Sequence, residues 1–213
     1  MQDDSADDGL VLKDIRIAVR KIAVTGWLND DVGQPLNWSV DVTCEKHHFA
    51  DGWDLAPHFY DECFVNDLKD WTGLAHRRFR PDDDDDDSFP ALYLCAHMGL
   101  PESEIRFGER DGAGFDFSWH GLADANFDEA YGKRMPFSIR GKAVVTSITV
   151  RFIEPESGMV QGPEAAARDV MQRRGVRHDH LAFSRWRRFR DDPSDDDFHT
   201  ILVDFAPTGA IPA

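Results

Sequence analysis

The feature that most limits the fold is a strict alternation of apolar and polar side chains over residues 36–45. The apolar residues occupy every second position: Leu36, Trp38, Val40, Val42 and Cys44. Successive side chains of a β-strand point to opposite faces, so the pattern predicts a strand with one buried face and one solvated face. Sheets with one solvated face are commonly antiparallel, and the segment therefore indicates an antiparallel sheet.

Alternation recurs along the chain and predicts about eight strands, most of them antiparallel to their sequence neighbours. They cover residues 15–26, 36–45, 104–108, 114–120, 137–139, 143–153, 180–190 and 198–205. The alternation changes phase near Lys21, which predicts a bulge in the first strand. Turn-forming residues at 29–35 connect the first two strands, so we expect these strands to pair as a hairpin.

Two segments have a helical period instead. The first has Pro57 near its start, Gly73 after its end and an apolar stripe at helical spacing: Tyr60, Phe64, Leu68 and Trp71. The second covers residues 163–174, with Pro163 at its beginning and Gly175 just after it. The predicted fold class is thus α+β, predominantly antiparallel β, either sandwich-like or a curved sheet, with about two helices packed on it.

The chain shows no internal repeat and no clear linker, so we expect one main domain. The predicted parts are an acidic disordered tail over 1–12, an antiparallel β-rich core domain with one inserted helix over 13–155, and a C-terminal helix plus β-hairpin over 156–213 in the same domain. The acidic start lacks the cationic and apolar regions of a secretory signal. No apolar run approaches the roughly 20 residues that cross a bilayer. Three scattered cysteines fit a reducing compartment, and we therefore expect a cytoplasmic protein.

Charge is distributed unevenly along the sequence. The chain has 24 Lys and Arg against 40 Asp and Glu, a net charge of −16. Eight arginines lie between Arg168 and Arg190, where the only acids are Asp169 and Asp179, so this window carries +6 and the remaining residues carry −22. An acidic surface repels nucleic acid and speeds encounter with basic proteins. We therefore predict a basic protein partner rather than a membrane or a nucleic acid.

The predicted partner-binding residues come from two charged segments. The first is a run of aspartates that must be solvated or face cations: Asp82, Asp83, Asp84, Asp85, Asp86 and Asp87. The second is an arginine-rich strand pattern: Arg185, Trp186, Arg187 and Arg188. Arginines with interleaved aromatic residues also suit a nucleic-acid contact through residues 173–190, because arginines bind phosphates and aromatic rings stack on bases. Pairing of these arginines with the chain's own acids is the favoured alternative.

The densest group of metal-ligand residue types lies within residues 44–62. Its candidate ligands are His47, His48, His58 and Glu62, and i, i+4 spacing places the last two on one face of the first predicted helix. A transition-metal site needs three or four converging donors. This segment supports an alternative function, a metal-dependent hydrolase with a divalent transition metal. The preferred expectation is no cofactor, because Cys44 continues the apolar stripe of its strand.

Sequence motifs of catalysis are sparse. The chain has no Gly-x-Ser-x-Gly nucleophile elbow and no Gly-rich phosphate-binding loop, which lowers the expectation of an enzyme. A small, acidic, tryptophan-rich and antiparallel β profile is found among bacterial immunity and inhibitor proteins. The composition therefore favours a non-catalytic acidic binding protein, most concretely an immunity-type inhibitor of a bacterial toxin.

Overall fold

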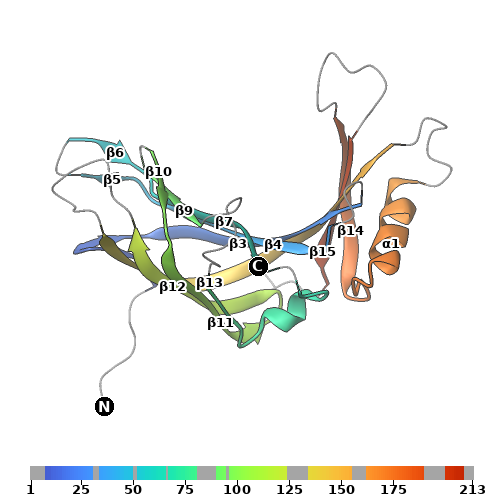
Figure 1. Ribbon diagram of the computed structural model, residues 1–213, viewed down its shortest axis with the longest axis horizontal. Helices are drawn as coiled ribbons and strands as arrows, with labels where there is room; N and C mark the ends of the chain where they lie inside the picture. Colours follow the sequence, from blue (N-terminus) through green and yellow to red (C-terminus); the bar gives the residue numbers. More distant parts are fainter. Residues whose placement is uncertain are drawn as a thin grey trace.

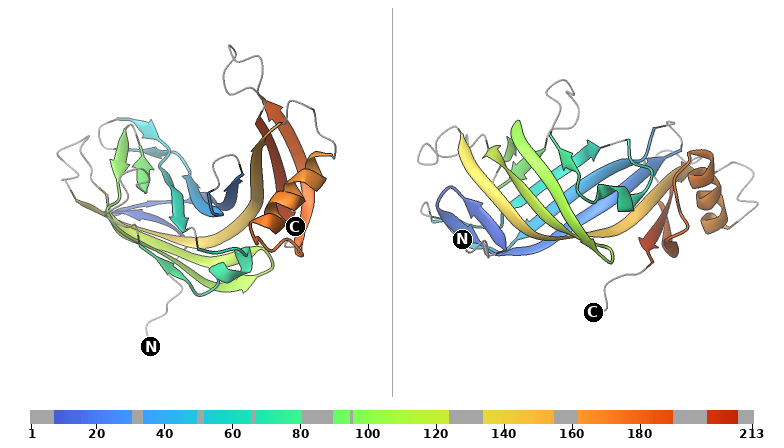
Figure 2. Two further views of the ribbon diagram at one scale, coloured as in Figure 1. Left: turned by 45° about the vertical axis from the view of Figure 1, so that its right-hand side comes forward. Right: turned by 90° about the horizontal axis from the view of Figure 1, so that it is seen from below.

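Most of the described residues belong to one large, strongly curled β-sheet (Figure 1). The structure is a computed structural model that describes residues 8–30, 34–49, 52–65, 67–80, 90–94, 96–123, 134–154, 162–189 and 200–208. A 13-stranded sheet contains most of the strands, and a separate two-stranded ribbon contains β5 and β6. The large sheet has the shape of a half-barrel, with a helix against one end (Figure 2).

The large sheet follows the path β10-β9-β7-β4-β3-β13-β12-β11-β8, with β1, β2, β14 and β15 attached beside it. In chain order the strands are β1 (Gly9–Leu12), β2 (Ile15–Ile17), β3 (Val19–Asn29), β4 (Asn37–Cys44), β5 (His47–His48), β6 (Asp54–Leu55), β7 (His58–Val65), β8 (Arg78–Phe79), β9 (Ala91–Tyr93), β10 (His97–Gly99), β11 (Glu102–Asp111), β12 (Gly114–Ala123), β13 (Met135–Ile153), β14 (Leu181–Phe189) and β15 (Thr200–Pro207). A 3₁₀ helix, η1 (Trp71–Leu74), and an α-helix, α1 (Pro163–Arg173), complete the described elements.

The long strand β13 joins the two halves of the sheet. Along one side it pairs with β1 and then, in parallel, with β3; along the other it pairs with β12 and then with β15. It contains both segments, 137–139 and 143–153, that the sequence predicts as separate strands. Because β3 runs parallel to β13, the sheet is mixed, but the other described strand pairs are antiparallel, as the sequence predicts for most of the strands. β1 also lies inside the predicted tail, so residues 9–12 form a strand where the sequence predicts disorder.

One face of the sheet is apolar and curls around the main core. β4 places the buried side chains of Trp38 and Val42 on this face, as its alternating pattern predicts. Because the sheet curls, Phe59 of β7 reaches strands that lie far from it in the sheet order. Its ring centroid is 5.9 Å from that of Trp119 on β12 and 5.0 Å from that of Phe137 on β13. The curl therefore produces a continuous core from a single sheet.

Helix α1 packs near the β13–β15 end of the sheet and confirms the second predicted helix. It buries Ala167, Val170 and Met171. The guanidinium carbon of Arg168 lies 4.9 Å from the centre of the Phe205 ring. Pro163 stands in the first turn, and Gly175 has a φ of 70°, the left-handed conformation that glycine adopts without strain. No described helix is long and apolar enough to cross a membrane.

The first predicted helix is wrong, so the described residues contain one α-helix rather than two. Residues 58–65 form strand β7 between β4 and β9, and residues 71–74 form only the 3₁₀ helix. Phe59 is buried against its cross-strand partner Val42, which explains why strand pairing outweighs the helical spacing of the aromatic residues. The predicted hairpin is confirmed as β3 and β4, with its bulge between Val19 and Lys21.

Candidate functional site

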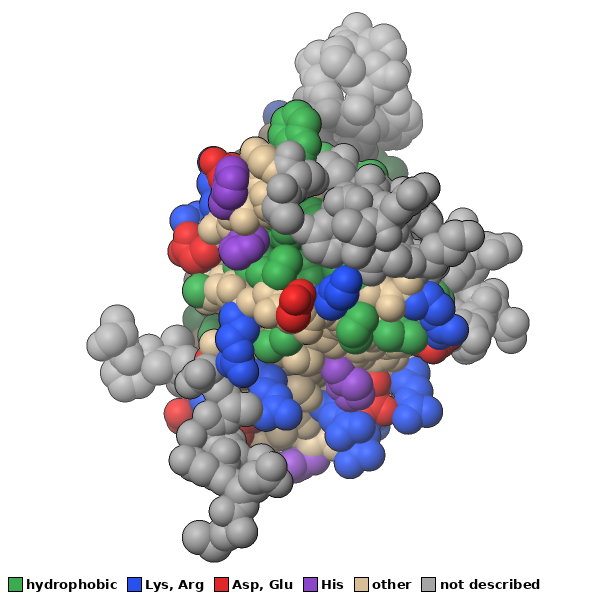
Figure 3. Space-filling model, turned by 90° about the vertical axis from the view of Figure 1, so that its left-hand side faces the viewer, with side chains coloured by type: hydrophobic (Ala, Val, Ile, Leu, Met, Phe, Trp, Pro, Cys, Tyr) green, Lys and Arg blue, Asp and Glu red, His purple; other side chains and the backbone are tan. Residues whose placement is uncertain are grey.

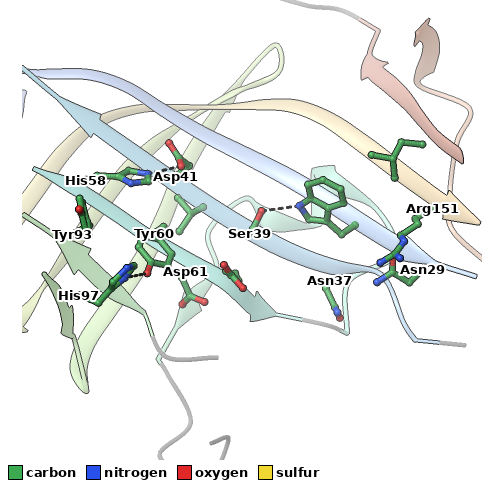
Figure 4. A pocket seen from close by; sticks show the side chains of 14 residues that line it. Asn29, Asn37, Ser39, Asp41, His58, Tyr60, Asp61, Tyr93, His97 and Arg151 are labelled. Carbon is green, nitrogen blue, oxygen red and sulfur yellow. Dashed lines mark hydrogen bonds and ion pairs between the residues drawn. The ribbon is translucent and has the colours of Figure 1, made fainter. Parts of the chain in front are cut away.

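A groove of about 1110 Å³ crosses the polar face of the sheet (Figure 4). Its lining residues come from β3, β4, β7, β9, β10, β13 and β15. The strand period explains this face. On β4, Asn37, Ser39 and Asp41 are half-buried on the groove side, whereas Trp38 and Val42 point into the core.

Two hydrogen-bonded pairs of side chains lie at the β4–β7 end of the groove. His58 Nε2 is 2.6 Å from Asp41 Oδ2, and the hydroxyl of Tyr60 is 2.6 Å from His97 Nδ1 (Figure 4). Burial and the negative charge of Glu62 raise the pKa of Tyr60, so this hydroxyl stays protonated at neutral pH. These side chains are therefore held in place by their partners before any ligand arrives.

Asp61 is the buried acid of the groove lining. The residue is 3% exposed, and its Oδ1 accepts a hydrogen bond of 3.1 Å from the backbone N–H of Cys63. Burial raises the pKa of Asp61 to about 6, and the charge of Glu62 adds to the shift, while the Cys63 hydrogen bond opposes it. Asp61 stands opposite the buried Val40, so its carboxylate is turned toward the buried face of β7 and is poorly solvated when it is ionised.

Aromatic rings line the groove beside its acids. Trp27 donates a hydrogen bond of 3.2 Å from its indole nitrogen to Ser39 Oγ, which fixes the orientation of the indole. Tyr93 is 43% exposed, and its ring centroid lies 5.0 Å from that of His97. Rings next to carboxylates suit an ammonium or guanidinium group, because the ring face attracts a cation and the carboxylate pairs with it. The chemistry of this end favours a basic ligand.

The predicted arginine strand is β14, and its arginines pair with Asp204 of the neighbouring strand β15 and with Glu154, which follows the end of β13. Arg185 Nε donates to Asp204 Oδ2 at 2.8 Å, Arg187 donates to the same carboxylate at 3.2 Å, and Arg188 pairs with Glu154 at 2.7 Å. Burial raises the pKa of Asp204, but these arginines and the hydroxyl of Thr149 outweigh it, so the pKa lies below its ordinary value. The buried acid is therefore ionised over the physiological pH range.

Internal pairing extends to all arginines of this block that the structure describes. In the helix and the turn after it, Arg168 pairs with Glu164, Arg173 and Arg174 with Asp30, and Arg177 with Asp70. The expectation that the arginines pair with the chain's own acids is thus confirmed for the described part of residues 168–190. The acidic runs expected to supply the partners, 82–87 and 191–197, lie outside the described residues.

The four candidate metal ligands are distributed over two strands. His47 and His48 lie on β5, where His48 Nδ1 is 2.8 Å from Asp54 Oδ1, and His58 and Glu62 lie on β7. Nowhere in the described ranges do three His, Cys, Asp or Glu side chains form a group that could hold a metal ion. Burial raises the pKa of the Cys44 thiol to about 12, which disfavours the thiolate that binds metals.

The outer surface at the β5–β6 end mixes charges of both signs. Figure 3 views the molecule from this side and shows basic, acidic and histidine side chains interspersed over the described surface. The groove is therefore distinguished by its shape rather than by surface charge alone. None of the protein-family models, curated proteins or solved structures compared with this chain matches it.

Sequence reasoning missed most of the groove. Tyr60 and Asp61 fall inside the segment that the aromatic spacing assigned to a helix, and the short strands of Tyr93 and His97 carry little periodic signal. The available signal was the polar face of residues 36–45, which places Asp41 opposite the core. Two of the predicted metal ligands, His58 and Glu62, line this groove, and His58 is hydrogen-bonded there to Asp41.

Proposed function

We propose that the protein is a non-catalytic binding protein of the cytoplasm whose acidic surface recognises a basic protein partner. The most concrete form of this function is an immunity-type inhibitor of a bacterial toxin. The observation that carries the proposal is the groove, where Asp41 and Glu62 stand beside the rings of Tyr60 and Tyr93. A lysine or arginine of the partner finds there both an anionic acceptor and an aromatic face.

The charge of the whole chain supports the same function. A net charge of −16 creates a long-range field that attracts a basic partner before contact and repels anionic competitors. Pairing with acids of the chain offsets most of the charge of the arginine block, although Arg185 and Arg187 share one acid. Association is therefore expected to be fast and to slow as salt is added.

Capture of partners from a native lysate, followed by mass spectrometry and a binding titration, tests this function. The double variant Asp41→Asn, Glu62→Gln should weaken binding of the captured basic protein at least about tenfold, because each change removes a carboxylate while keeping the size of the side chain. Asp67→Asn, Glu109→Gln is the matched control, since it removes the same charges from exposed positions outside the groove. Equal loss in both variants, or binding indifferent to salt, would contradict the proposal.

Two further measurements distinguish the alternative functions. Stoichiometric zinc, iron or manganese in protein purified without an affinity tag, lost on replacing His47, His48 or His58, would favour the metal-dependent hydrolase. Binding of single-stranded RNA or DNA at physiological salt, reduced by replacing Arg185, Arg187 and Arg188 with alanine, would favour the nucleic-acid contact. The proposed function predicts neither result.

A further inference from the structure

The groove and the arginine strand share one face of the sheet. Strand register places Arg185 of β14 opposite Asp204 of β15, which stands opposite Thr149 of β13. Thr149 in turn stands opposite Trp27 of β3, and Trp27 opposite Asn37 of β4. Residues directly opposite each other point to the same face, so one row of side chains crosses these strands. The groove lined by Trp27 and Asn37 therefore continues toward β14.

The two ends of this row carry opposite charges. At the β14 end, Arg185 and Arg187 share the single carboxylate of Asp204, which leaves one positive charge in excess. Both guanidinium groups are also more exposed than the carboxylate, which is nearly inaccessible to solvent. At the β4–β7 end stand Asp41 and Glu62, and between the ends lie Trp27 and Leu202 together with Asn29, Asn37 and Arg151. The face is therefore basic toward β14, both apolar and polar in its middle, and acidic at the β4–β7 end.

The length of this face selects an extended ligand. From β14 to β7 the sheet order crosses five inter-strand steps, β14-β15-β13-β3-β4-β7. At about 4.8 Å per step, the width across these strands is roughly 24 Å. Asp41 also lies four residues along β4 from Asn37, the β4 residue of the row, so the path between the charged ends is roughly 27 Å. An extended chain advances about 3.3–3.6 Å per residue, so roughly seven to eight residues span the path. A compact ligand, or a single side chain, reaches only one of the two charged ends.

We infer that this face binds an extended segment of the basic partner that carries charges of both signs. A lysine or arginine of the segment pairs with Asp41 and Glu62, and an aspartate or glutamate about seven residues away pairs with Arg185 and Arg187. Apolar residues between them cover Trp27 and Leu202. The inference rests on the proposed function, because it names the part of the basic partner that enters the groove. A polyanion fits poorly, since it meets carboxylates at the β4–β7 end.

Selection from a displayed library of random nine-residue peptides on the full chain tests this inference. The expected enriched peptides have a basic residue and an acidic residue separated by about five to seven positions. Enrichment of peptides with basic residues alone would overturn the inference and leave the proposed function standing. Enrichment that does not favour basic residues, or no enrichment above an unrelated acidic protein, would count against both.

A double-mutant cycle, which combines a substitution in the peptide with one in the protein, then locates the acidic residue of the bound peptide. Changing that acidic residue to its amide should weaken binding of the peptide to the native protein about tenfold. The same change should weaken binding to the Arg187→Gln variant less than about twofold. This variant keeps Arg185 as the partner of the buried Asp204, and thermal unfolding checks that it remains folded. Arg188→Gln is the matched control, because Arg188 pairs with Glu154 and stands opposite Ile201, on the other face of β14 from Arg185 and Arg187. If the amide change in the peptide had the same effect on binding to Arg187→Gln and to Arg188→Gln, the pairing of the acidic residue with Arg187 would be overturned.

Discussion

Arg185 donates a hydrogen bond of 2.8 Å from Nε to Oδ2 of Asp204, which joins the edge strand β14 to a buried acid of β15. The same carboxylate accepts hydrogen bonds from the hydroxyl of Thr149 at 2.8 Å and from Arg187 at 3.2 Å. Three strands therefore converge on one ionised group that is 4% exposed. Because a buried charge is stable only with its partners in place, this contact fixes how β14 sits against the sheet.

Asp204→Ala should lower the free energy of unfolding by about 3 kcal/mol, because it removes a buried acid and leaves two arginines and a hydroxyl without their acceptor. Urea unfolding followed by tryptophan fluorescence measures the change. Glu45→Ala is the control, since Glu45 and Arg20 form an ion pair at the surface and their loss should leave stability nearly unchanged. Equal effects of the two substitutions would contradict the structural role of Asp204.

The same contact predicts a pH dependence with a definite sign. The folded-state pKa of Asp204 is lowered, so its stabilisation is present above the unfolded-state pKa near 4 and is lost as pH falls through the folded-state value. The difference in unfolding free energy between the native protein and Asp204→Ala should therefore shrink below about pH 4. Titration of both proteins by urea at several pH values measures it, and a difference that grows toward low pH would contradict the pairing.

For Asp61 we expect a pH dependence of stability with the opposite sign. Its pKa rises from 3.8 to about 6 on folding, so the cost of burying the carboxylate is absent below about pH 4 and complete above about pH 6. Asp61→Asn keeps an oxygen acceptor for the Cys63 N–H and should raise the free energy of unfolding at pH 7.5 by about 3 kcal/mol. Near pH 4 the two proteins should be almost equally stable. If Asp61→Asn were less stable than the native protein at pH 7.5, the Asp61 carboxylate would be stabilised by its surroundings rather than destabilised by burial.

Gly121→Ala should destabilise the pairing of β11 with β12. A Cβ at this position would lie 2.3 Å from the Glu102 carbonyl oxygen and 2.7 Å from Ser103 Cα, and both are backbone atoms that move only if the strands separate. The expected loss is about 3 kcal/mol or more, measured as a lower unfolding midpoint in urea. Gly99→Ala is the control, because its Cβ would meet nothing closer than Pro101 Cδ at 3.8 Å. Similar effects of both changes would exclude the close approach at Gly121.

Ser103→Ala should stabilise the protein by about 1 kcal/mol, because its buried hydroxyl has no hydrogen-bond partner among the described residues. The measurement is the free energy of unfolding in urea. Ser39→Ala should have the opposite effect, since Ser39 Oγ donates to the Thr25 carbonyl at 3.3 Å and accepts from the Trp27 indole. A loss of stability in Ser103→Ala would indicate that the hydroxyl is satisfied.

Local patterns were enough to predict several elements. The alternation at 36–45 predicts β4 with the correct buried face, and the phase change at Lys21 predicts the bulge of β3. Pro163 and Gly175 likewise bound the predicted helix, which matches α1 closely. These features depend on the side-chain period and on backbone preferences of single residues, which do not require knowledge of distant parts of the chain. Where period and pairing conflict, as at 58–65, the local pattern misled, because Phe59 is held by partners remote in sequence.

The sequence by itself determined which side chains of a strand share a face, but only the tertiary structure decided which strands lie side by side. Nothing local to Arg185 or Asp41 indicates that β14 and β4 belong to one sheet, with β15, β13 and β3 between them. β13 makes this arrangement, because it is long enough to pair with β3 on one side and with both β12 and β15 on the other. Strand pairing uses backbone hydrogen bonds that every residue offers, so the choice of neighbour depends on the burial of the whole apolar face. That collective choice places an arginine strand and an acidic groove on one surface.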